Sequence, residues 1–259
     1  MSLTAPAATR IFECVSAARS DVGRIRRENE DACLERPEIG VWAVADGMGG
    51  HAAGAHASRT IVEHLALVPL QPTLSALVEA VEAALVNANE ALIEFGMLER
   101  QTVGSTVVAL ALHGDHAVMM WAGDSRIYRL RGGLLQQLTT DHSEVERYVQ
   151  LGLITREEAH AHPASHMLTR AVGIDVPLFL DMDIQQLAPG DRFLLCSDGL
   201  ERHVTPEQVR NMLLDSTPGD AADAMIQATL AGGASDNVTV VVVDVHELDG
   251  GDAPREVRA

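Results

Sequence analysis

Residues 41–51 read VWAVADGMGGH, an apolar, β-branched stretch that ends abruptly in Asp46 and Gly47. A run of this kind predicts a buried strand, and the aspartate marks the point where the strand leaves the core. The same pattern, an aspartate at one end of an apolar run, recurs in residues 117–124 (AVMMWAGD), 192–198 (RFLLCSD) and 236–245 (DNVTVVVVDV). Three of these aspartates follow their strands and Asp236 precedes one. In a sandwich of antiparallel strands all four can therefore meet at one edge.

The rest of the pattern separates strands from helices. Further apolar, β-branched runs predict strands over residues 103–112, 127–138 and 178–187. Apolar residues at helical spacing predict one helix over 52–67 and a long one that follows the N-cap Thr73 and reaches residue 97. Threonines at possible helix starts mark three more helices, after Thr155, Thr205 and Thr217. The predicted strands and helices fall into separate groups along the chain and do not alternate one by one. This order favours an α+β fold with antiparallel sheets over a regular βαβ alternation.

The charge balance excludes several classes of partner. The chain has 259 residues, with 19 Lys and Arg against 37 Asp and Glu, and a formal net charge of −18 at pH 7. Without a basic stripe, neither nucleic acid nor an anionic membrane surface is an expected partner. No run approaches about 18 apolar residues, and the N-terminus lacks the layout of a signal peptide. Cys14, Cys33 and Cys196 lack CxxC spacing, so free thiols in a reducing cytoplasm are expected.

Aspartates brought together at one edge repel one another unless cations neutralise them. Carboxylate, carbonyl and water oxygens are the ligands that Mg²⁺ and Mn²⁺ prefer, and a glycine after Asp46 lets a backbone carbonyl turn toward an ion. Asp-Gly and Asp-Asn are also ordinary turn sequences, which is the plainer interpretation of any single pair. For all four aspartates taken together with Asp31, a divalent metal site is the stronger interpretation.

A cationic segment precedes these aspartates. Residues 20–31 read SDVGRIRRENED, and the planar fork of an arginine binds phosphate oxygens in pairs. From this segment onward the chain carries eight short motifs in order: GxxRxxNED (23–31), DGMGGHxxG (46–54), GST (104–106), GDSR (123–126), DHS (141–143), HMLTRAVG (166–173), SDG (197–199) and SDN (235–237). Over roughly residues 12–246 this order resembles the metal-dependent protein phosphatase family, the protein phosphatase 2C type in its compact bacterial form.

The resemblance implies a fold and a division of the chain. The fold is a four-layer α-β-β-α sandwich with two central antiparallel sheets and a flap insert beside the active site. The expected catalytic domain covers residues 11–246, with the flap over about 142–170. Residues 1–10 are expected to form an N-terminal tail, and residues 247–259 a disordered C-terminal tail.

The resemblance also implies a binuclear Mn²⁺ or Mg²⁺ centre in a cleft at one edge of the sheets. Asp46 would bridge the two ions and the Gly47 carbonyl would bind one of them. Asp198 and Asp236 would bind the other.

Three more roles come from the same resemblance. Asp31 would sit around the ions, largely through waters. Asp124, together with Asp198, would hold a third and weaker ion. Arg26 would occupy the phosphate-binding position, with Arg24 and Arg27 as bystanders.

The ions dictate the expected mechanism. Two cations a few Å apart lower the pKa of a bridging water, so hydroxide attacks phosphorus in line and no phosphoenzyme forms. Arg26 neutralises charge that develops on the phosphoryl oxygens. We therefore expect a cytoplasmic protein serine/threonine phosphatase that acts on phosphorylated proteins. Its expected partners are a cognate Ser/Thr kinase and the targets of that kinase, and its expected state is a monomer.

The sequence departs from the family pattern in two places. Met48 stands where the larger eukaryotic members have a histidine implicated in protonating the leaving alkoxide, which leaves His51 or water as the general acid. Gly54 is followed by Ala55 and His56, whereas the motif usually continues with glutamate. That second change concerns a peripheral contact.

Other interpretations stay open from sequence alone. Cys196-x-x-Gly-x-x-Arg202 has the spacing of a cysteine-phosphatase loop, although Asp198 inside it would repel phosphate. Residues 47–52 match GxGxxA, as in dinucleotide folds. Histidines gather in the expected flap and are more simply exposed polar residues than a zinc site: His142, His160, His162 and His166. At the level of function, the alternatives are a catalytically silent phosphoprotein-binding module and a metal-dependent phosphodiesterase.

Overall fold

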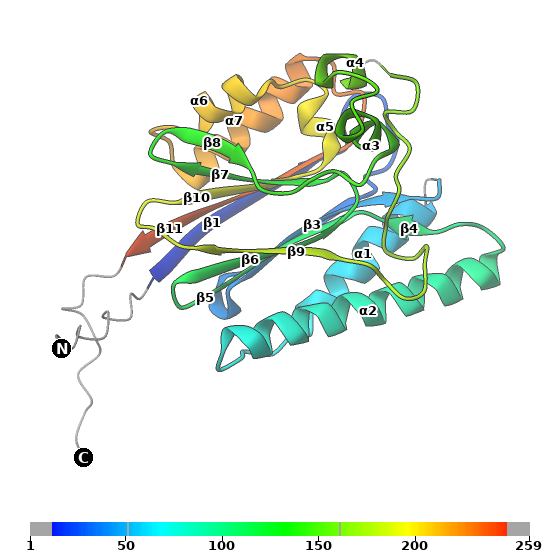
Figure 1. Ribbon diagram of the computed structural model, residues 1–259, viewed down its shortest axis with the longest axis horizontal. Helices are drawn as coiled ribbons and strands as arrows, with labels where there is room; N and C mark the ends of the chain where they lie inside the picture. The colour runs from blue at the N-terminus through cyan, green and yellow to red at the C-terminus, as the bar shows by residue number, and fades with distance from the viewer. Residues whose placement is uncertain (1–11, 51, 161, 248–259) are drawn as a thin grey trace.

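The strand that carries Asp46 belongs to one of two sheets that face each other (Figure 1). The computed structural model describes residues 12–50, 52–160 and 162–247. One sheet has the strand order β1-β11-β10-β7-β8, and the other has the order β2-β3-β5-β6-β9, with the short β4 paired to β3. All the described strand pairs are antiparallel, as the sequence predicts.

The elements have the following bounds. The strands are β1 (Phe12–Asp21), β2 (Asp31–Arg36), β3 (Val41–Met48), β4 (Gly104–Ser105), β5 (Val107–His113), β6 (His116–Ala122), β7 (Arg126–Arg131), β8 (Leu134–Gln137), β9 (Asp181–Gln186), β10 (Arg192–Cys196) and β11 (Val238–Glu247). The helices are the 3₁₀ turn η1 (Pro37–Ile39), α1 (Ala52–Ala66), α2 (Leu74–Glu99), α3 (Glu144–Gln150), α4 (Arg156–His160), α5 (Asp198–Glu201), α6 (Pro206–Leu213) and α7 (Pro218–Ala231).

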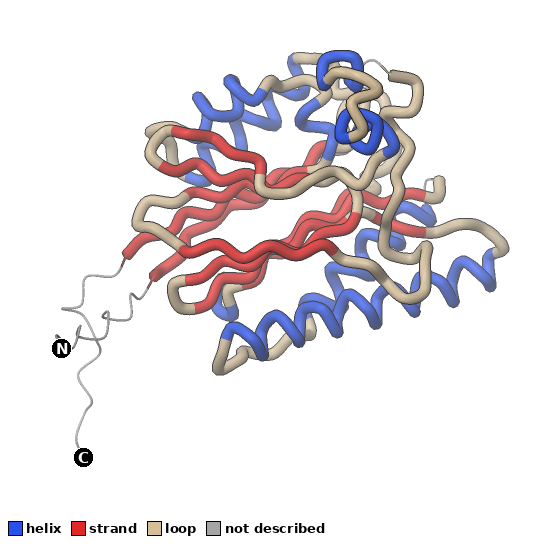
Figure 2. Tube along the Cα trace, in the orientation of Figure 1, coloured by secondary structure: helices blue, strands red, loops and turns tan. Residues whose placement is uncertain are grey.

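Helices cover the outer face of each sheet, which completes the expected four-layer α-β-β-α arrangement (Figure 2). Helices α1 and α2 pack on the sheet that contains β3, and α6 and α7 pack on the sheet that contains β11. The short helices α3 and α4 lie together at one end of the sandwich, close to α5 (Figure 1).

Three apolar cores separate the layers. Between the sheets Trp42 and Phe193 are fully buried, and the Trp42 indole donates a hydrogen bond to Ser16 Oγ at 3.0 Å, which ties β3 to β1. Leu85 is buried beneath the α1–α2 layer, and Met225 is buried beneath the α6–α7 layer. Each sheet thus buries both faces, which explains its nearly continuous apolar strands.

Side-chain caps begin the helices where the sequence predicts them. Thr73 Oγ1 accepts a hydrogen bond from the Ala76 amide at 3.2 Å at the start of α2. Thr205 and Gln208 form a reciprocal capping box at α6, and the Thr217 side chain caps α7. Such caps satisfy amide groups that the first turn leaves without partners.

Several elements differ from the sequence expectation. The strands β1 and β2 and the short helices α3 and α5 have no counterpart among the predicted elements. The run 127–138 is a hairpin of two strands, because Gly132 and Gly133 turn the chain with φ values of 54° and 78°. The run 103–112 is likewise divided, into β4 and β5.

The two expected tails lie almost entirely outside the described residues. β11 extends to Glu247, the first residue of the expected C-terminal tail, and residues 1–10 and 248–259 lie outside the described part of the chain. Among the described helices, none combines the length and apolar character that crossing a bilayer requires.

Candidate active site

Strands from both sheets open onto one cleft of about 350 Å³. It is lined by six of the residues singled out in the sequence, Arg26, Asp46, Gly47, Asp124, Asp198 and Asp236. Asp31, the seventh, pairs in register with Asp46 across β2 and β3. The aspartates that the sequence places at strand ends therefore come together in space.

Hydrogen bonds from neighbouring motifs hold the backbone of Asp46. The Asp46 amide donates to Thr106 Oγ1 at 3.1 Å, and the Asp46 carbonyl accepts from Ser105 Oγ at 2.9 Å. Thr106 Oγ1 lies 2.7 Å from Ser125 Oγ, and both groups are buried. The GST and GDSR motifs thus fix the main chain that presents Asp46 to the cleft.

Gly47 lies where two backbone segments come too close for a side chain. A Cβ atom at this position would stand 1.9 Å from the Gly54 carbonyl oxygen and 2.8 Å from the Glu30 carbonyl oxygen. The Gly47 amide donates to that same Glu30 oxygen at 3.0 Å. This close packing joins α1, β3 and the segment before β2, so only glycine fits here.

Asp31 is a buried carboxylate with one satisfied oxygen. Ser197 Oγ donates to Asp31 Oδ2 at 2.7 Å, whereas Asp31 Oδ1 is buried without a hydrogen-bond partner. Burial raises the pKa of Asp31 to about 7, hydrogen bonds from Ser197 and Thr239 oppose that rise, and the charges of Asp198 and Asp236 add to it. Asp31 thus lies inside the electrostatic field of the cleft, although it does not line the cavity.

Asp46 and Asp124 are also difficult to ionise in the absence of a cation. Burial raises the pKa of Asp46 well above its usual value, and the charges of Asp31, Asp198 and the other cleft aspartates raise it further. Burial, followed by the charge of Asp198, raises the pKa of Asp124 to about 8. Carboxylates packed this closely ionise together at neutral pH only when cations join them.

Arg26 reaches the cleft from the loop between β1 and β2. Its Nε lies 2.9 Å from Asp236 Oδ1 and its Nη2 lies 2.9 Å from Asp236 Oδ2, which is a bidentate pair. The next residue, Asn237, holds the loop itself. Its Nδ2 donates to the carbonyls of Val22 and Glu28 at 2.8 and 3.0 Å. The sequence identified Arg26 and Asp236 but missed this positioning role of Asn237, which the SDN motif contains.

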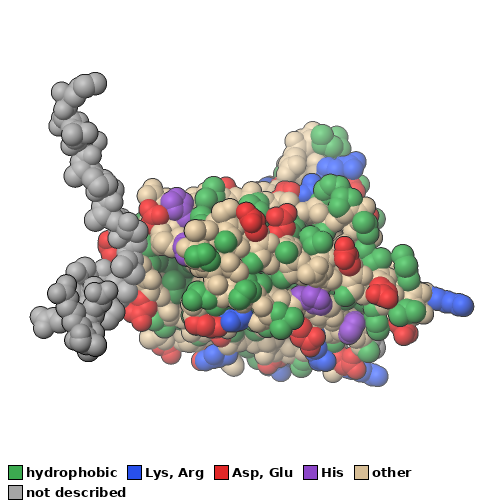
Figure 3. All heavy atoms as spheres, turned by 90° about the horizontal axis from the view of Figure 1, so that it is seen from below, with side chains coloured by type: hydrophobic (Ala, Val, Ile, Leu, Met, Phe, Trp, Pro, Cys, Tyr) green, Lys and Arg blue, Asp and Glu red, His purple; other side chains and the backbone are tan. Residues whose placement is uncertain are grey.

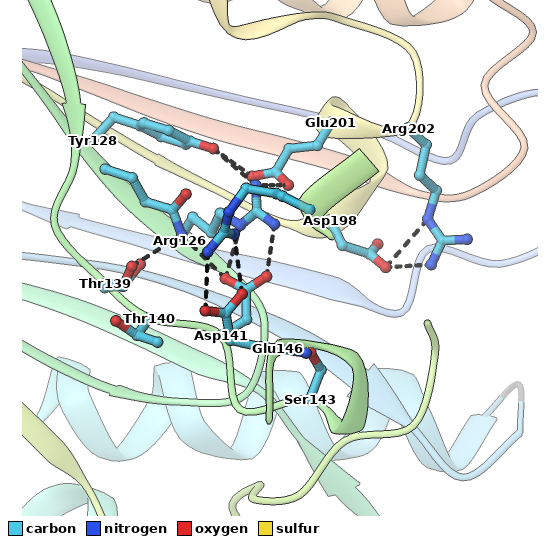
Figure 4. A network of polar contacts seen from close by, with 12 residues as sticks. Arg126, Tyr128, Thr139, Thr140, Asp141, Ser143, Glu146, Asp198, Glu201 and Arg202 are labelled. Carbon is cyan, nitrogen blue, oxygen red and sulfur yellow. Dashed lines mark hydrogen bonds and ion pairs between the residues drawn. The ribbon is translucent and has the colours of Figure 1, made fainter. Parts of the chain in front are cut away.

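Arg202 is a second cleft arginine that the sequence did not assign to this site. It follows α5, pairs with Asp198 Oδ2, and lines the cleft (Figure 4). The available signal was its spacing, since residues four apart on a helix lie on the same face. The sequence placed Arg202 only within the alternative cysteine loop.

The cleft fits divalent cations. Among the described residues no three His, Cys, Asp or Glu side chains converge into a finished cage, and Asp198 and Asp236 are paired with arginines. Yet Asp198 Oδ1 and Asp31 Oδ1 are buried without hydrogen-bond partners. An ion would satisfy such oxygens, which are costly to leave bare. The donors are all oxygens, the set that Mg²⁺ and Mn²⁺ prefer.

The segment expected as the flap borders the cleft. It is closed at its base by backbone pairing of Ser143 with Leu168 and carries α3 and α4. His166 and Leu168 line the cleft. A second cavity of about 540 Å³, shared between Asp198 and flap residues such as His162, adjoins it. The segment therefore forms part of the wall of both cavities.

The structure does not support the cysteine or zinc alternatives. Cys196 is fully buried, and burial raises the pKa of its thiol well above the usual range, so it is no exposed thiolate. His142 Nε2 lies 3.2 Å from Asp181, and His166 Nδ1 lies 3.2 Å from Arg202 Nη2. Among the flap histidines whose side chains the structure describes, which are His142, His162 and His166, no group of three metal-binding side chains forms.

Two further expectations concern residues 47–52, namely the dinucleotide-fold alternative and the general acid. The residues that match the dinucleotide pattern run from the end of β3, an antiparallel strand, to the start of α1, which is not the parallel βαβ unit of a dinucleotide fold. His51, the candidate general acid, lies outside the described residues.

A protein-family model and a curated relative both match most of this chain. A family model described as Protein phosphatase 2C matches residues 26–232. The serine/threonine protein phosphatase PstP of Mycobacterium tuberculosis is 39% identical over 238 residues, which are 91% of this chain and 46% of that protein. The chain thus spans about half the length of this curated relative.

Two solved structures have the same fold. PppA, described as a key regulatory component of the T6SS in Pseudomonas aeruginosa, is 41% identical, with a TM-score of 0.84 over 91% of this chain and 98% of that one. The catalytic domain of PstP in complex with two manganese ions is 37% identical, with a TM-score of 0.80 over 91% of this chain and 100% of that one. A manganese-containing relative therefore shares nearly the whole described fold.

Proposed function

Since the chain belongs to the protein phosphatase 2C family, we propose that it is a metal-dependent protein serine/threonine phosphatase that hydrolyses phosphoserine and phosphothreonine in proteins. One observation carries the proposal: in the same cleft, Arg26 forms a bidentate pair beside partly buried aspartates that come from both sheets. Carboxylates supply the ion ligands and the arginine supplies phosphate recognition. The catalytic unit is proposed to cover residues 11–246.

The chain's own residues divide into ligands and a phosphate-binding group. Asp46 and the Gly47 carbonyl would hold ions on the side of β3, and Asp198 and Asp236 would do so on the side of β10 and β11. Asp31 would contribute largely through water. Divalent ions bound there would supply Lewis-acid chemistry, activating water and neutralising phosphoryl oxygens. No phosphoenzyme is needed, in agreement with the burial of Cys196.

Arg26 is the residue that would contact the phosphoryl group of the substrate. Its fork now spans both oxygens of Asp236, and a phosphoryl group offers the same spacing of two oxygens. Nearly half of the Arg26 side chain is exposed (45%), so the fork is accessible from solvent. It would neutralise charge on the equatorial oxygens as the transition state forms.

The setting of this activity is part of the proposal. The substrates would be phosphorylated proteins, produced by a cognate Ser/Thr kinase, and the location would be the cytoplasm. We propose a monomer.

A substrate panel with and without Mn²⁺ tests the function. Phosphate release is measured from phosphoserine and phosphothreonine peptides, an aryl phosphate and an aryl phosphodiester. We expect turnover of both peptides and the aryl phosphate, loss of that turnover with a chelator, and retention of it in Cys196→Ala. Binding of the peptides without turnover would instead identify a silent phosphoprotein-binding module, and turnover of the diester alone would identify a phosphodiesterase.

A further inference from the structure

Arg202 divides the Asp198 carboxylate into two unlike oxygens. Its Nε lies 3.2 Å from Asp198 Oδ2, and its Nη2 forms an ion pair with the same oxygen (Figure 4). Asp198 Oδ1 has no hydrogen-bond partner and is buried. One oxygen of this ligand is thus held by a cation of the chain, while the other remains available to an ion.

The guanidinium is surrounded by the other acids of the cleft. Arg202 Nη2 lies 3.9 Å from Asp236 Oδ2, and the charges of Asp198, Asp236 and Asp124 all stabilise the cation. On its other side, Nη2 lies 3.2 Å from Nδ1 of His166. The side chain is therefore held between α5 and the flap, and it lines both cavities.

Arg202 lies where the sequence resemblance implies a third, weaker ion. The carboxylates that the resemblance assigns to that ion are those of Asp124 and Asp198, and both line the cleft together with Arg202. Arg202 covers the second of these. A single remaining carboxylate is a poor ligand set for a divalent ion, which takes about six oxygen ligands.

We propose that the Arg202 guanidinium is a tethered cation that holds Asp198 Oδ2 in place of a third divalent ion, so that this chain uses two ions and one fixed arginine. The inference rests on the proposed function in taking the cleft as a two-ion site. A fixed arginine neutralises the Asp124–Asp198 side of the cleft without depending on the concentration of free metal.

Counting bound Mn²⁺ tests the proposal without using catalysis. Metal-free protein is titrated up to millimolar Mn²⁺ by calorimetry, and free Mn²⁺ is followed by electron paramagnetic resonance. We expect two ions in the wild type and three in Arg202→Gln. The third ion should disappear again in the double variant with Asp124→Asn, because Asp124 is its remaining ligand beside Asp198.

Arg156→Gln is the matched control. Arg156 lines the neighbouring cavity and pairs with Glu146 of the flap, so its loss changes the net charge equally without freeing Asp198. It should bind two ions. Three ions in the wild type, or two ions in a folded Arg202→Gln variant with unchanged affinities, would overturn the proposal.

The wild-type count remains decisive if Arg202→Gln does not fold. Failure of the proposed function gives a different result, namely two bound ions without phosphate release from the phosphopeptides. The two ideas can therefore fail separately.

Discussion

Arg26 is the single residue whose loss should affect catalysis most selectively. We expect Arg26→Ala to lower kcat/KM for a phosphothreonine peptide by about 10²–10³, the usual cost of removing one preorganised group that stabilises transition-state charge. Because the fork contacts two oxygens of Asp236, Arg26→Lys should not restore activity. The neighbouring Arg27 is exposed, and Arg27→Ala should change kcat/KM less than threefold. A loss below about tenfold in Arg26→Ala would contradict the assigned role.

A substitution at Gly47 tests the close backbone packing around this residue. Gly47→Ala would place a Cβ atom 1.9 Å from the Gly54 carbonyl oxygen, backbone that cannot yield easily. We expect a loss of about 3 kcal/mol or more in the free energy of unfolding, measured by urea denaturation. Gly219→Ala in α7 is the control, because its Cβ would meet nothing closer than 3.8 Å. That variant should be as stable as the parent or up to about 1 kcal/mol more stable.

At the residue scale, the sequence predicts the site residues that lie in recognisable motifs and misses the residues that hold them in place. Asp46, Asp124, Asp198 and Asp236 end or begin apolar runs, so a pattern reveals them. Their ligand roles stay predictions. Arg202 has no motif of its own, and its position depends on a contact with Asp198 that only the turn of α5 creates.

At the element scale, the central strands are predictable and the edges are not. The strands β3, β5, β6, β10 and β11 are buried on both faces and therefore read as continuous apolar runs. The strands β1 and β2 lie at the edges of their sheets. β1 has only partly buried and exposed positions, and β2 buries only Asp31 and Leu34 of its six residues. Their composition of Ala, Ser, Cys and charged residues lacks the apolar run that would reveal them.

A largely buried network of polar side chains connects the flap to α5. Arg126 of β7 pairs with Asp141, next to the flap, and with Glu201, the last residue of α5 (Figure 4). Tyr128 Oη donates to Glu201 Oε1 at 2.7 Å. The first residue of α5 is Asp198, so the network positions a proposed ligand.

Removing the arginine should therefore be costly. We expect Arg126→Ala to reduce the free energy of unfolding by about 3 kcal/mol, toward the lower end for buried pairs, because it leaves two largely but not fully buried carboxylates without their cation. Tyr128→Phe removes one hydrogen bond and should cost about 1 kcal/mol. Both values come from denaturant unfolding of metal-free protein. Equal effects of the two substitutions would show that Arg126 is not the centre of the network.

At the scale of the whole molecule, acidic residues are spread over the surface and are also concentrated in the cleft. Seen from the side of α2, acidic side chains lie among scattered arginines and histidines (Figure 3), as a net charge of −18 implies. The cleft concentrates carboxylates where the sheets meet, with Asp46 from one sheet facing Asp198 beside the other. Bound cations would therefore stabilise the junction of the two halves of the sandwich as well as receive a phosphoryl group.

This arrangement gives the stability of the metal-free protein an unusual pH dependence. The folded-state pKa of Asp31 is raised to about 7 and that of Asp124 to about 8, from an ordinary value of 3.8. Between about pH 4 and pH 8 these two carboxyl groups therefore bind more protons in the folded protein than in the unfolded chain. Since stability falls with pH wherever the folded state binds more protons, metal-free protein should lose stability as pH rises through this window.

Thermal unfolding at pH 5.5 and pH 8, with and without Mn²⁺, measures the effect. A tenfold difference in proton affinity between the folded and unfolded states corresponds to about 1.4 kcal/mol, so we expect metal-free protein to melt several degrees lower at about pH 8 than at about pH 5.5. Saturating Mn²⁺ should reverse this order, because ions bind only the ionised carboxylates and stabilise the folded state by mass action. Asp124→Asn removes one titrating group and should flatten the metal-free profile. A metal-free protein that becomes more stable toward pH 8 would show that these carboxylates are already neutralised within the chain.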